Sequence, residues 1–278
     1  MRARRGGHGI SSKLDWKPDP VWDQLAGSAR PSWYLDPLVA RQKRDRHLKL
    51  FRAWMPAAAG SGLKTDVFEE AFGEDALLGD LAPLAQTWIA MDVAAGTVRQ
   101  ARARMALPSV RFLVCDVRRM PLRSASLDVV ISNSTLDHFA TRPEFEAAIA
   151  ELARILRPGG RLLITTDNPH NLLYFPLRWL SRARWFPFTL GHTPSPANFR
   201  KTLEQAGLRV IDTSWLIHNP RMFSTALFLL LRRVWGARAD GFIQWSLDAF
   251  ALLEHLPTRR FTACFVGACA VRPPAAPL

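Results

Sequence analysis

Residues 127–166 read LDVVISNSTLDHFATRPEFEAAIAELARILRPGGRLLITT. This stretch contains two short apolar runs, Leu127 to Ser132 and Arg161 to Thr166, on either side of one long segment with helical spacing. Short apolar runs bounded by turn residues are typical of buried strands. A strand, a helix and a second strand in this order predict a parallel βαβ unit.

The segment between the two runs carries its own start and stop signals. Thr141 and Glu144 have the spacing of a capping box, and Pro158-Gly159-Gly160 ends the pattern. These signals predict a helix over Arg142 to Leu156. Its apolar face consists of Phe145, Ala148, Ile149, Leu152 and Ile155.

Outside this stretch the same alternation begins at about Ser61 and continues nearly to the end of the chain. The further candidate strands are Leu63 to Phe68, Thr87 to Met91, Val110 to Cys115, Leu208 to Ile217 and Phe261 to Val271. Together with the first two they predict an α/β, Rossmann-like fold: a mostly parallel seven-stranded sheet with helices on both faces.

The rest of the chain is expected to decorate this domain. We place the domain at residues 61–278, with lid segments at about 172–200 and 213–260, and an N-terminal extension at residues 1–60. Within the extension, Pro37 to Trp54 has the spacing of an amphipathic helix that Asp36 can cap. We expect this helix to pack on the core.

Composition narrows the class of protein. The 278 residues are 48% apolar and carry a net charge of +13, but the arginines are spread along the chain, so we expect a solvated basic surface rather than a nucleic-acid site. The three cysteines follow no paired spacing, and no apolar run follows the charged N-terminus. These features favour a cytoplasmic protein without a secretory signal.

The most apolar stretch is Met222 to Trp235, which Arg232 and Arg233 interrupt. It is shorter than the roughly 20 residues that a membrane span needs. We expect a buried lid helix; the alternative is a helix that lies on a membrane surface.

Two aspartates have the right placement to bind a nucleoside. Asp92 directly follows the run Trp88 to Met91, and Asp116 follows the run that ends at Cys115. At the carboxyl ends of parallel strands, one carboxylate can accept hydrogen bonds from ribose hydroxyls and the other can bind an adenine amino group.

The order of these elements resembles the class I S-adenosylmethionine-dependent methyltransferases of the small-molecule, type 11-like group. The resemblance rests on Cys115-Asp116, on Leu136-Asp137-His138-Phe139 and on Glu151 to Leu163, and covers Trp88 to Thr166. It implies S-adenosylmethionine as cofactor and a small-molecule acceptor such as a natural product, glycan or lipid precursor. Its implied cofactor contacts are Asp92, Val93, Cys115, Asp116, Val117 and Asn133.

The first loop departs from the family, which has an acidic residue followed by a Gly-x-Gly-x-Gly-like loop. Here Lys64 is followed by Thr65-Asp66-Val67-Phe68-Glu69-Glu70-Ala71-Phe72-Gly73. If Asp66 takes the acidic place, Phe68, Glu69 and Glu70 fill most of the turn and Gly73 alone remains. We expect this loop to border the cofactor, with Glu69 or Glu70 pairing with its ammonium group; alternatively both glutamates simply start a helix.

Methyl transfer needs alignment, and a general base only where the acceptor must lose a proton. We expect His138, then His170, to serve as base or acceptor-orienting group, with Asp137 beside them. No metal site is expected, because the seven histidines are scattered.

Two other functions stay open. The net charge and Asp167-Asn168-Pro169-His170 suggest a nucleic-acid methyltransferase, although the motif lacks the second proline and the aromatic residue of amino-group methylases. The missing glycines suggest a non-catalytic protein that has lost the methyl donor.

Overall fold

The computed structural model describes residues 36–180 and 191–274, which contain a seven-stranded sheet of order β3-β2-β1-β4-β5-β7-β6. Only β7 runs antiparallel to its neighbours. The predicted α/β class and mostly parallel sheet are confirmed. The strands are β1 (Ser61–Thr65), β2 (Thr87–Asp92), β3 (Val110–Val114), β4 (Leu127–Asn133), β5 (Leu156–Asp167), β6 (Arg209–Leu216) and β7 (Phe265–Val271).

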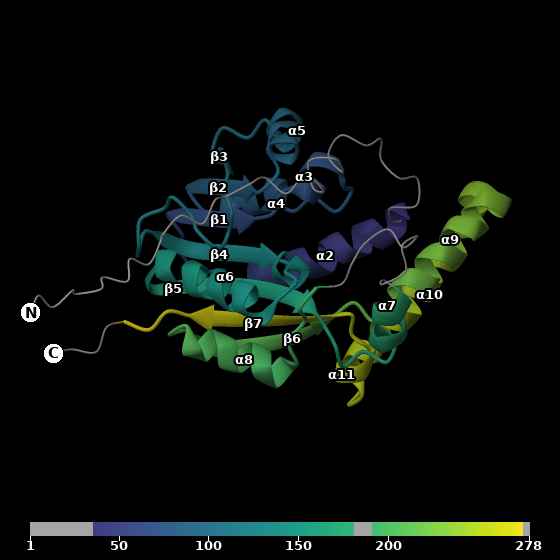
Figure 1. Ribbon diagram of the computed structural model, residues 1–278. Coiled ribbons are helices and arrows are strands. Elements are labelled where there is room, and N and C mark those ends of the chain that lie inside the picture. The colour runs from purple at the N-terminus through teal and green to yellow at the C-terminus, as the bar shows by residue number, and fades with distance from the viewer. Residues whose placement is uncertain (1–35, 181–190, 275–278) are drawn as a thin grey trace, which may run out of the picture.

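Helices connect and cover these strands (Figure 1). Before β5 they are α2 (Pro37–Trp54), α3 (Phe68–Phe72), α4 (Leu78–Leu81), α5 (Ala95–Met105) and α6 (Arg142–Ile155), with short 3₁₀ turns η1 (Ala82–Leu84) and η2 (Leu136–His138). After β5 they are α7 (Tyr174–Leu180), α8 (Pro196–Gln205), α9 (Arg221–Trp235), α10 (Asp240–Ala251) and α11 (Arg259–Thr262), with η3 (Gly236–Ala239) and η4 (Leu252–His255).

The sheet has a buried core on each face. Alternate residues of β5 point to opposite faces, so Leu162 belongs to one apolar cluster and Leu163 to the other. Figure 1 shows α6 in front of the sheet and α2 behind it. The predicted capping box of α6 is present, with Thr141 and Glu144 bonded to each other.

Helix α2 is integral to the rear layer. Asp36 accepts a hydrogen bond from the Leu38 amide at 2.9 Å, which confirms the predicted cap. Phe51 and Trp54 are buried in the same cluster as β4 and β5, and the Trp54 indole donates to Asp212 at 2.8 Å. The extension thus contributes a helix that covers the sheet.

The first strand ends earlier than predicted. The pattern Leu63 to Phe68 suggested one continuous strand, but β1 stops at Thr65 and Phe68 begins α3. Asp66 has a φ of 62° in the left-handed region, and its carboxylate accepts from the Phe68 amide at 2.8 Å. Asparagine and aspartate tolerate this conformation because they bond to nearby backbone, so Asp66 turns the chain without a glycine.

Helix α9 corrects the expectation of a buried lid helix. Among its side chains that the structure describes, Ser224 and Phe228 are buried, whereas Phe223, Leu227, Leu230, Val234 and Trp235 are exposed. Apolar character along this stretch therefore did not mean burial. Within the described ranges, no helix is both long and apolar enough to cross a membrane.

Candidate functional site

The carboxyl ends of β1 to β5 meet at one edge of the sheet, because these strands are parallel. The order reverses between β1 and β4, which is where ligands bind in open α/β sheets. Asp66 after β1 and Ser134 after β4 both have positive φ, so the backbone turns sharply at the end of each of these strands. Thr65 joins the two strand ends, with its hydroxyl 3.0 Å from that of Ser132 and 2.9 Å from that of Thr135.

Asp92 is the last residue of β2 and is held in place by backbone groups. Its Oδ1 accepts from the Ala94 amide at 2.9 Å and its Oδ2 from the Val67 amide at 3.1 Å. The second bond ties the end of β2 to the loop after β1. Each carboxylate oxygen has further lone-pair capacity, so Asp92 can still accept hydrogen bonds from a ligand.

Asp66, Glu69 and Asp92 form a group of carboxylates at this edge. Burial raises the pKa of Asp66 well above its usual range, and the charges of Glu69 and Asp92 raise it further. Burial also raises the pKa of Asp92, against its two backbone hydrogen bonds. The site therefore carries an excess of negative charge that a positively charged ligand would relieve.

Glu69 differs from the other two because it has cationic neighbours. Burial disfavours its charge, but Lys43 and Lys64 outweigh that effect and lower the pKa of Glu69 to about 2. The Lys43 ammonium lies 3.3 Å from Glu69 Oε1 and 2.6 Å from Asp75 Oδ2. Glu69 is therefore ionised at neutral pH and only partly buried.

Glu70 has a structural role. It is fully buried, with Oε2 2.9 Å from the Lys64 ammonium and Oε1 accepting from the Leu77 and Leu78 amides at 3.1 Å each. Burial opposes the charge on Lys64, yet Glu70 and the neighbouring carboxylates raise its pKa. Of the two glutamates, Glu69 is the one left to meet a ligand. Sequence reasoning missed Lys64, although a lysine inside an apolar strand signals a buried partner.

Asp116 follows β3, but its carboxylate is already engaged. Arg118 donates three side-chain hydrogen bonds to it, at 3.0, 3.0 and 2.6 Å. Arg118 also bonds Glu144 at 2.6 Å and lies 5.1 Å above the Phe139 ring. A ligand amino group would have to share Asp116 with this arginine.

The other expected cofactor residues surround these carboxylates. Val93 follows Asp92 at the end of β2, and Gly73 ends α3, where an added Cβ would lie 2.6 Å from Asp75. Phe68 packs on Phe72 at a ring distance of 5.2 Å. Three are buried: Cys115, Val117 and Asn133. Burial, with help from Asp116 and Asp92, raises the pKa of the Cys115 thiol to about 12, so it is no nucleophile at neutral pH.

The candidate catalytic residues lie beyond β4 and β5. Asp137 is buried in η2, and its Oδ2 accepts from the Asp167 amide at 3.2 Å, which places the two strand ends side by side. His138 and His170 are exposed in the turns that follow. Asn133 bonds the Thr165 hydroxyl at 2.7 Å through its Oδ1.

Gly191 packs against η2 on this side of the edge. Its amide donates to the Asp137 carbonyl at 3.1 Å, and an added Cβ would lie 2.4 Å from two backbone oxygens, those of Asp137 and Phe139. No side chain fits there. The segment that resumes at Gly191 therefore covers one side of the turn that carries Asp137 and His138.

Asn168 belongs to the motif that suggested a nucleic-acid methyltransferase, and Arg232 is one of the two arginines that interrupt the apolar stretch Met222 to Trp235; both side chains bond to other parts of the fold. The Asn168 amide is buried and donates to the carbonyls of Arg260 and Ala263 at 2.8 and 2.9 Å. Arg232 pairs with buried Asp36 and with Asp240, the latter at 2.7 Å. Neither group is presented to a nucleic acid.

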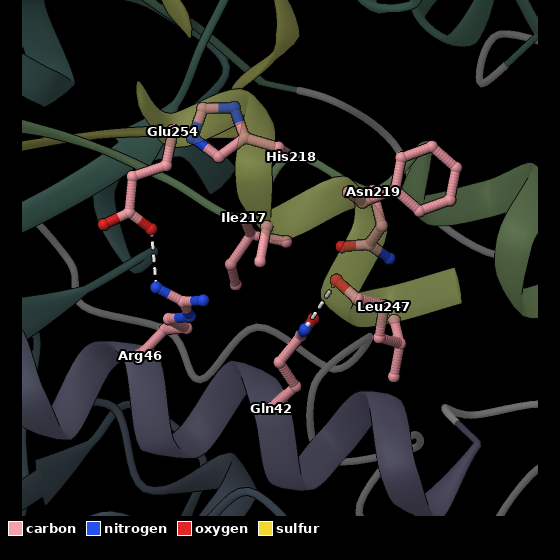
Figure 2. Close-up of a pocket in the computed structure, with 9 residues that line it drawn as sticks. Gln42, Arg46, Ile217, His218, Asn219, Leu247 and Glu254 are labelled. Atoms are coloured by element: carbon pink, nitrogen blue, oxygen red, sulfur yellow. Dashed lines mark hydrogen bonds and ion pairs between the residues drawn. The ribbon is translucent and has the colours of Figure 1, made fainter. Parts of the chain in front are cut away.

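A small pocket lies where α2, α10 and the residues after β6 meet (Figure 2). Arg46 and Glu254 form an ion pair of 2.5 Å at its wall, and Gln42 donates to the Leu247 carbonyl at 3.1 Å. His218 is buried there with Nδ1 2.8 Å from the Thr262 hydroxyl, and burial lowers its pKa. These contacts join α2 to α10 and η4. His218 is buried between these elements and has a structural role.

An apolar acceptor pocket under the two lid segments would need buried aromatic residues, and the aromatic residues of these segments divide into three groups. Tyr174 and Phe228 are buried and Trp215 is half-buried. Trp185, Phe186 and Phe188 lie outside the described residues. Others are exposed: Phe175, Trp179, Phe223 and Trp235. Phe175, Trp179, Phe223 and Trp235 therefore do not line a closed pocket in this structure.

Among residues 36–180 and 191–274, no three His, Cys, Asp or Glu side chains gather as metal ligands. The polar groups at the sheet edge are carboxylates, backbone amides and hydroxyls. Such groups bind hydroxyls and cations by hydrogen bonds and charge.

Comparison with known proteins shows which proteins this part of the chain is similar to. Residues 68–164 match the family model described as a methyltransferase domain. A probable S-adenosylmethionine-dependent methyltransferase of Mycolicibacterium smegmatis is 32% identical over 156 residues, which are 55% of this chain and 56% of that protein. The chain thus spans about half the length of this relative.

Two further matches are narrower or more distant. Mouse tRNA (carboxymethyluridine(34)-5-O)-methyltransferase ALKBH8 is 52% identical over 52 residues, 19% of this chain and 8% of that protein. The N-methyltransferase NodS of Bradyrhizobium japonicum, in complex with S-adenosyl-L-homocysteine, superposes with a TM-score of 0.53 at 14% identity, covering 83% of this chain and 87% of that one. At that identity the likeness shows the fold alone.

Proposed function

We propose that the chain is a class I S-adenosylmethionine-dependent methyltransferase and that it transfers a methyl group to a small-molecule acceptor. S-adenosylmethionine, when bound, supplies a methyl group activated by a positively charged sulfur. Since that reaction is a displacement, the protein's part is to bind, orient and exclude water.

The chemistry of the carboxyl edge fits this cofactor. Asp92, with both oxygens fixed by backbone amides, can accept from a ribose diol. The cofactor is a cation at its sulfonium and ammonium groups, and Asp66, Glu69 and Asp92 supply the negative charge that would balance it. The left-handed turn at Asp66 brings the chain round without the glycines of the usual loop. The carboxylate group at the end of β1 and β2 is the observation that carries the proposal.

On the acceptor side, we place the reacting atom near η2 and the turn after β5. Asp137 is held by the Asp167 amide, and the exposed rings of His138 and His170 can orient an acceptor or take its proton. Gly191 packs on the same turn and restricts its movement. We therefore propose His138 and His170 as the groups that meet the acceptor.

Asp92 provides the test. Replacement of Asp92 by alanine should weaken S-adenosylmethionine binding by roughly 1.5 to 3 kcal/mol, since it removes charge-assisted hydrogen bonds. Asp45→Ala is the matched control, because Asp45 is exposed on α2 with Arg44 as its partner. Both are measured by isothermal titration calorimetry. Equal affinity in Asp92→Ala and the parent would remove Asp92 from the site.

A tRNA or other nucleic-acid acceptor is the second candidate, favoured by the 52-residue match to mouse ALKBH8 and by the net charge of +13. Exposed Arg233 and Arg238, like exposed Arg259 and Arg260, are basic groups of the lobe after β6 that would contact phosphates. If the acceptor is a nucleic acid, the affinity for RNA should fall steeply as the salt concentration rises. It should also be lower in the double variant Arg233→Ala, Arg238→Ala than in the parent. Weak RNA binding that changes neither with salt nor in the double arginine variant would support the small-molecule acceptor.

A further inference from the structure

Helix α9 presents one continuous apolar stripe to solvent. The exposed fractions are 65% for Phe223, 47% for Leu227, 57% for Leu230 and 65% for Val234. Their spacing of four, three and four residues places them on one side of the helix. Four large apolar side chains in a row are therefore in contact with water.

The opposite side of α9 is anchored, so the orientation of this stripe is fixed. Phe228 is buried with Ile243 and Leu247 of α10 and Val39 of α2. Arg232 pairs with the buried Asp36 and with Asp240. The stripe is thus held outward by the rest of the fold.

Neighbouring helices extend the apolar surface. Phe242 and Trp245 are exposed on α10 with their rings 5.9 Å apart, and Phe175 and Trp179 are exposed one turn apart on α7. Figure 1 shows α7, α9 and α10 at one end of the molecule, beyond the carboxyl ends of the parallel strands. The contacts in Figure 2 link α2 to Leu247 of α10 and to Glu254 of η4. Exposed apolar side chains gathered at one end of a molecule in this way mark an interaction site.

The positive charge around the stripe indicates a partner with a negatively charged surface. Residues 221–262 contain six arginines and three acidic residues, and two of the acids, Asp240 and Glu254, are paired with arginines. Arg233 and Arg238 are exposed at the C-terminal end of α9, next to exposed Trp235. Phenylalanine and leucine on one face, with tryptophan and arginine at its border, suit the interface of an anionic bilayer.

We propose that α9, with its stripe Phe223, Leu227, Leu230 and Val234, docks the protein on the surface of an anionic lipid bilayer. The stripe enters the acyl boundary, while Arg233 and Arg238 meet lipid phosphates. A second copy of the chain fits less well, because a symmetric contact would pair this patch with itself, and residues 221–262 hold six arginines against three acidic residues and so offer no charge complement. The inference does not depend on the reaction that the domain catalyses.

Sedimentation of the full chain with lipid vesicles tests the docking. Vesicles of phosphatidylcholine containing phosphatidylglycerol should bind the protein, and pure phosphatidylcholine vesicles should bind it less. The pair Phe223→Ser with Leu230→Ser should lower the partition coefficient about tenfold or more, since it removes much of the buried apolar area. Ile211→Ser, which changes an exposed apolar side chain on β6, should leave partitioning unchanged.

Arg233→Ser with Arg238→Ser should weaken binding to the anionic vesicles alone, and added salt should do the same. The thermal midpoint of each variant checks that the fold is intact. Full-length protein that stays in the supernatant with anionic vesicles at low salt would overturn the proposal. So would unchanged partitioning of the stripe variant, or a stripe that instead holds a dimer in solution or a protein partner.

Discussion

At the scale of single residues, the carboxylates at the ends of β1 and β2 lower the stability of the fold, and we propose that they strengthen the binding of S-adenosylmethionine. The pKa of Asp66 is raised in the folded protein, so its ionised form is disfavoured there. A carboxyl group of this kind adds stability below its unfolded-state pKa, and that stability is lost as the pH rises through the folded-state pKa. Ionised Asp66 thus opposes folding at neutral pH.

Asp66→Asn should therefore stabilise the protein at pH 7, by about 1.4 kcal/mol for each unit by which the pKa is raised. Asparagine keeps the left-handed turn and can still accept from the Phe68 amide. At lower pH the gain should shrink, because the raised pKa lets Asp66 of the folded protein take up a proton before an ordinary aspartate does. Urea unfolding at pH 7 and at a lower pH measures it. An equal gain in the free energy of unfolding at both pH values, or a loss at pH 7, would show that the raised pKa of Asp66 is not the cause.

Glu69 and Glu70 are adjacent but should respond in opposite ways to the same change. Glu70→Gln leaves Lys64 without its buried counter-charge and should destabilise the fold by about 3 kcal/mol. Glu69→Gln should have a small effect on unfolding and a larger effect on S-adenosylmethionine affinity. Chemical unfolding and calorimetry of the two variants separate these effects. Loss of stability in Glu69→Gln, with none in Glu70→Gln, would reverse the two roles.

At the scale of elements, sequence patterns located most helices and strands because those elements bury one face. The helix from Pro37 to Trp54 and the strand beginning at Thr87 appear where predicted. The strand predicted from Leu63 to Phe68 ends at Thr65, because the turn at Asp66 depends on a side-chain bond that periodicity does not reveal. The burial of α9 was also mispredicted, since an apolar pattern cannot say whether water or protein covers it.

The anchoring of α9 by Arg232 can be measured against its neighbour. Arg232→Ala leaves Asp36 buried without its charged partner and should lower the free energy of unfolding by about 2 kcal/mol. Arg233→Ala, on the exposed side of the same helix, should change it by less than about 0.5 kcal/mol. Guanidinium unfolding of both variants compares them. Equal effects would mean that the ion pair with Asp36 does not hold α9 in place.

At the scale of the whole molecule, the fold and the class of ligand could be predicted from the sequence, whereas the details of the site could not. Asp92 and Asp116 lie at strand ends as their positions after apolar runs indicated. The pairing of Asp116 with Arg118 and of Glu70 with Lys64 depends on side-chain directions across different elements. Spacing along the chain does not encode those directions.

The central claim is that this glycine-poor loop, with its carboxylates, still binds S-adenosylmethionine. Titration of S-adenosylmethionine into the full chain at pH 7 tests it most directly, with the thermal midpoint followed in parallel. We predict saturable one-to-one binding and a midpoint that rises with ligand, as expected when about 2.7 kcal/mol is gained at a ligand concentration of 100 times Kd. No saturable heat and an unchanged midpoint at millimolar ligand would contradict the account.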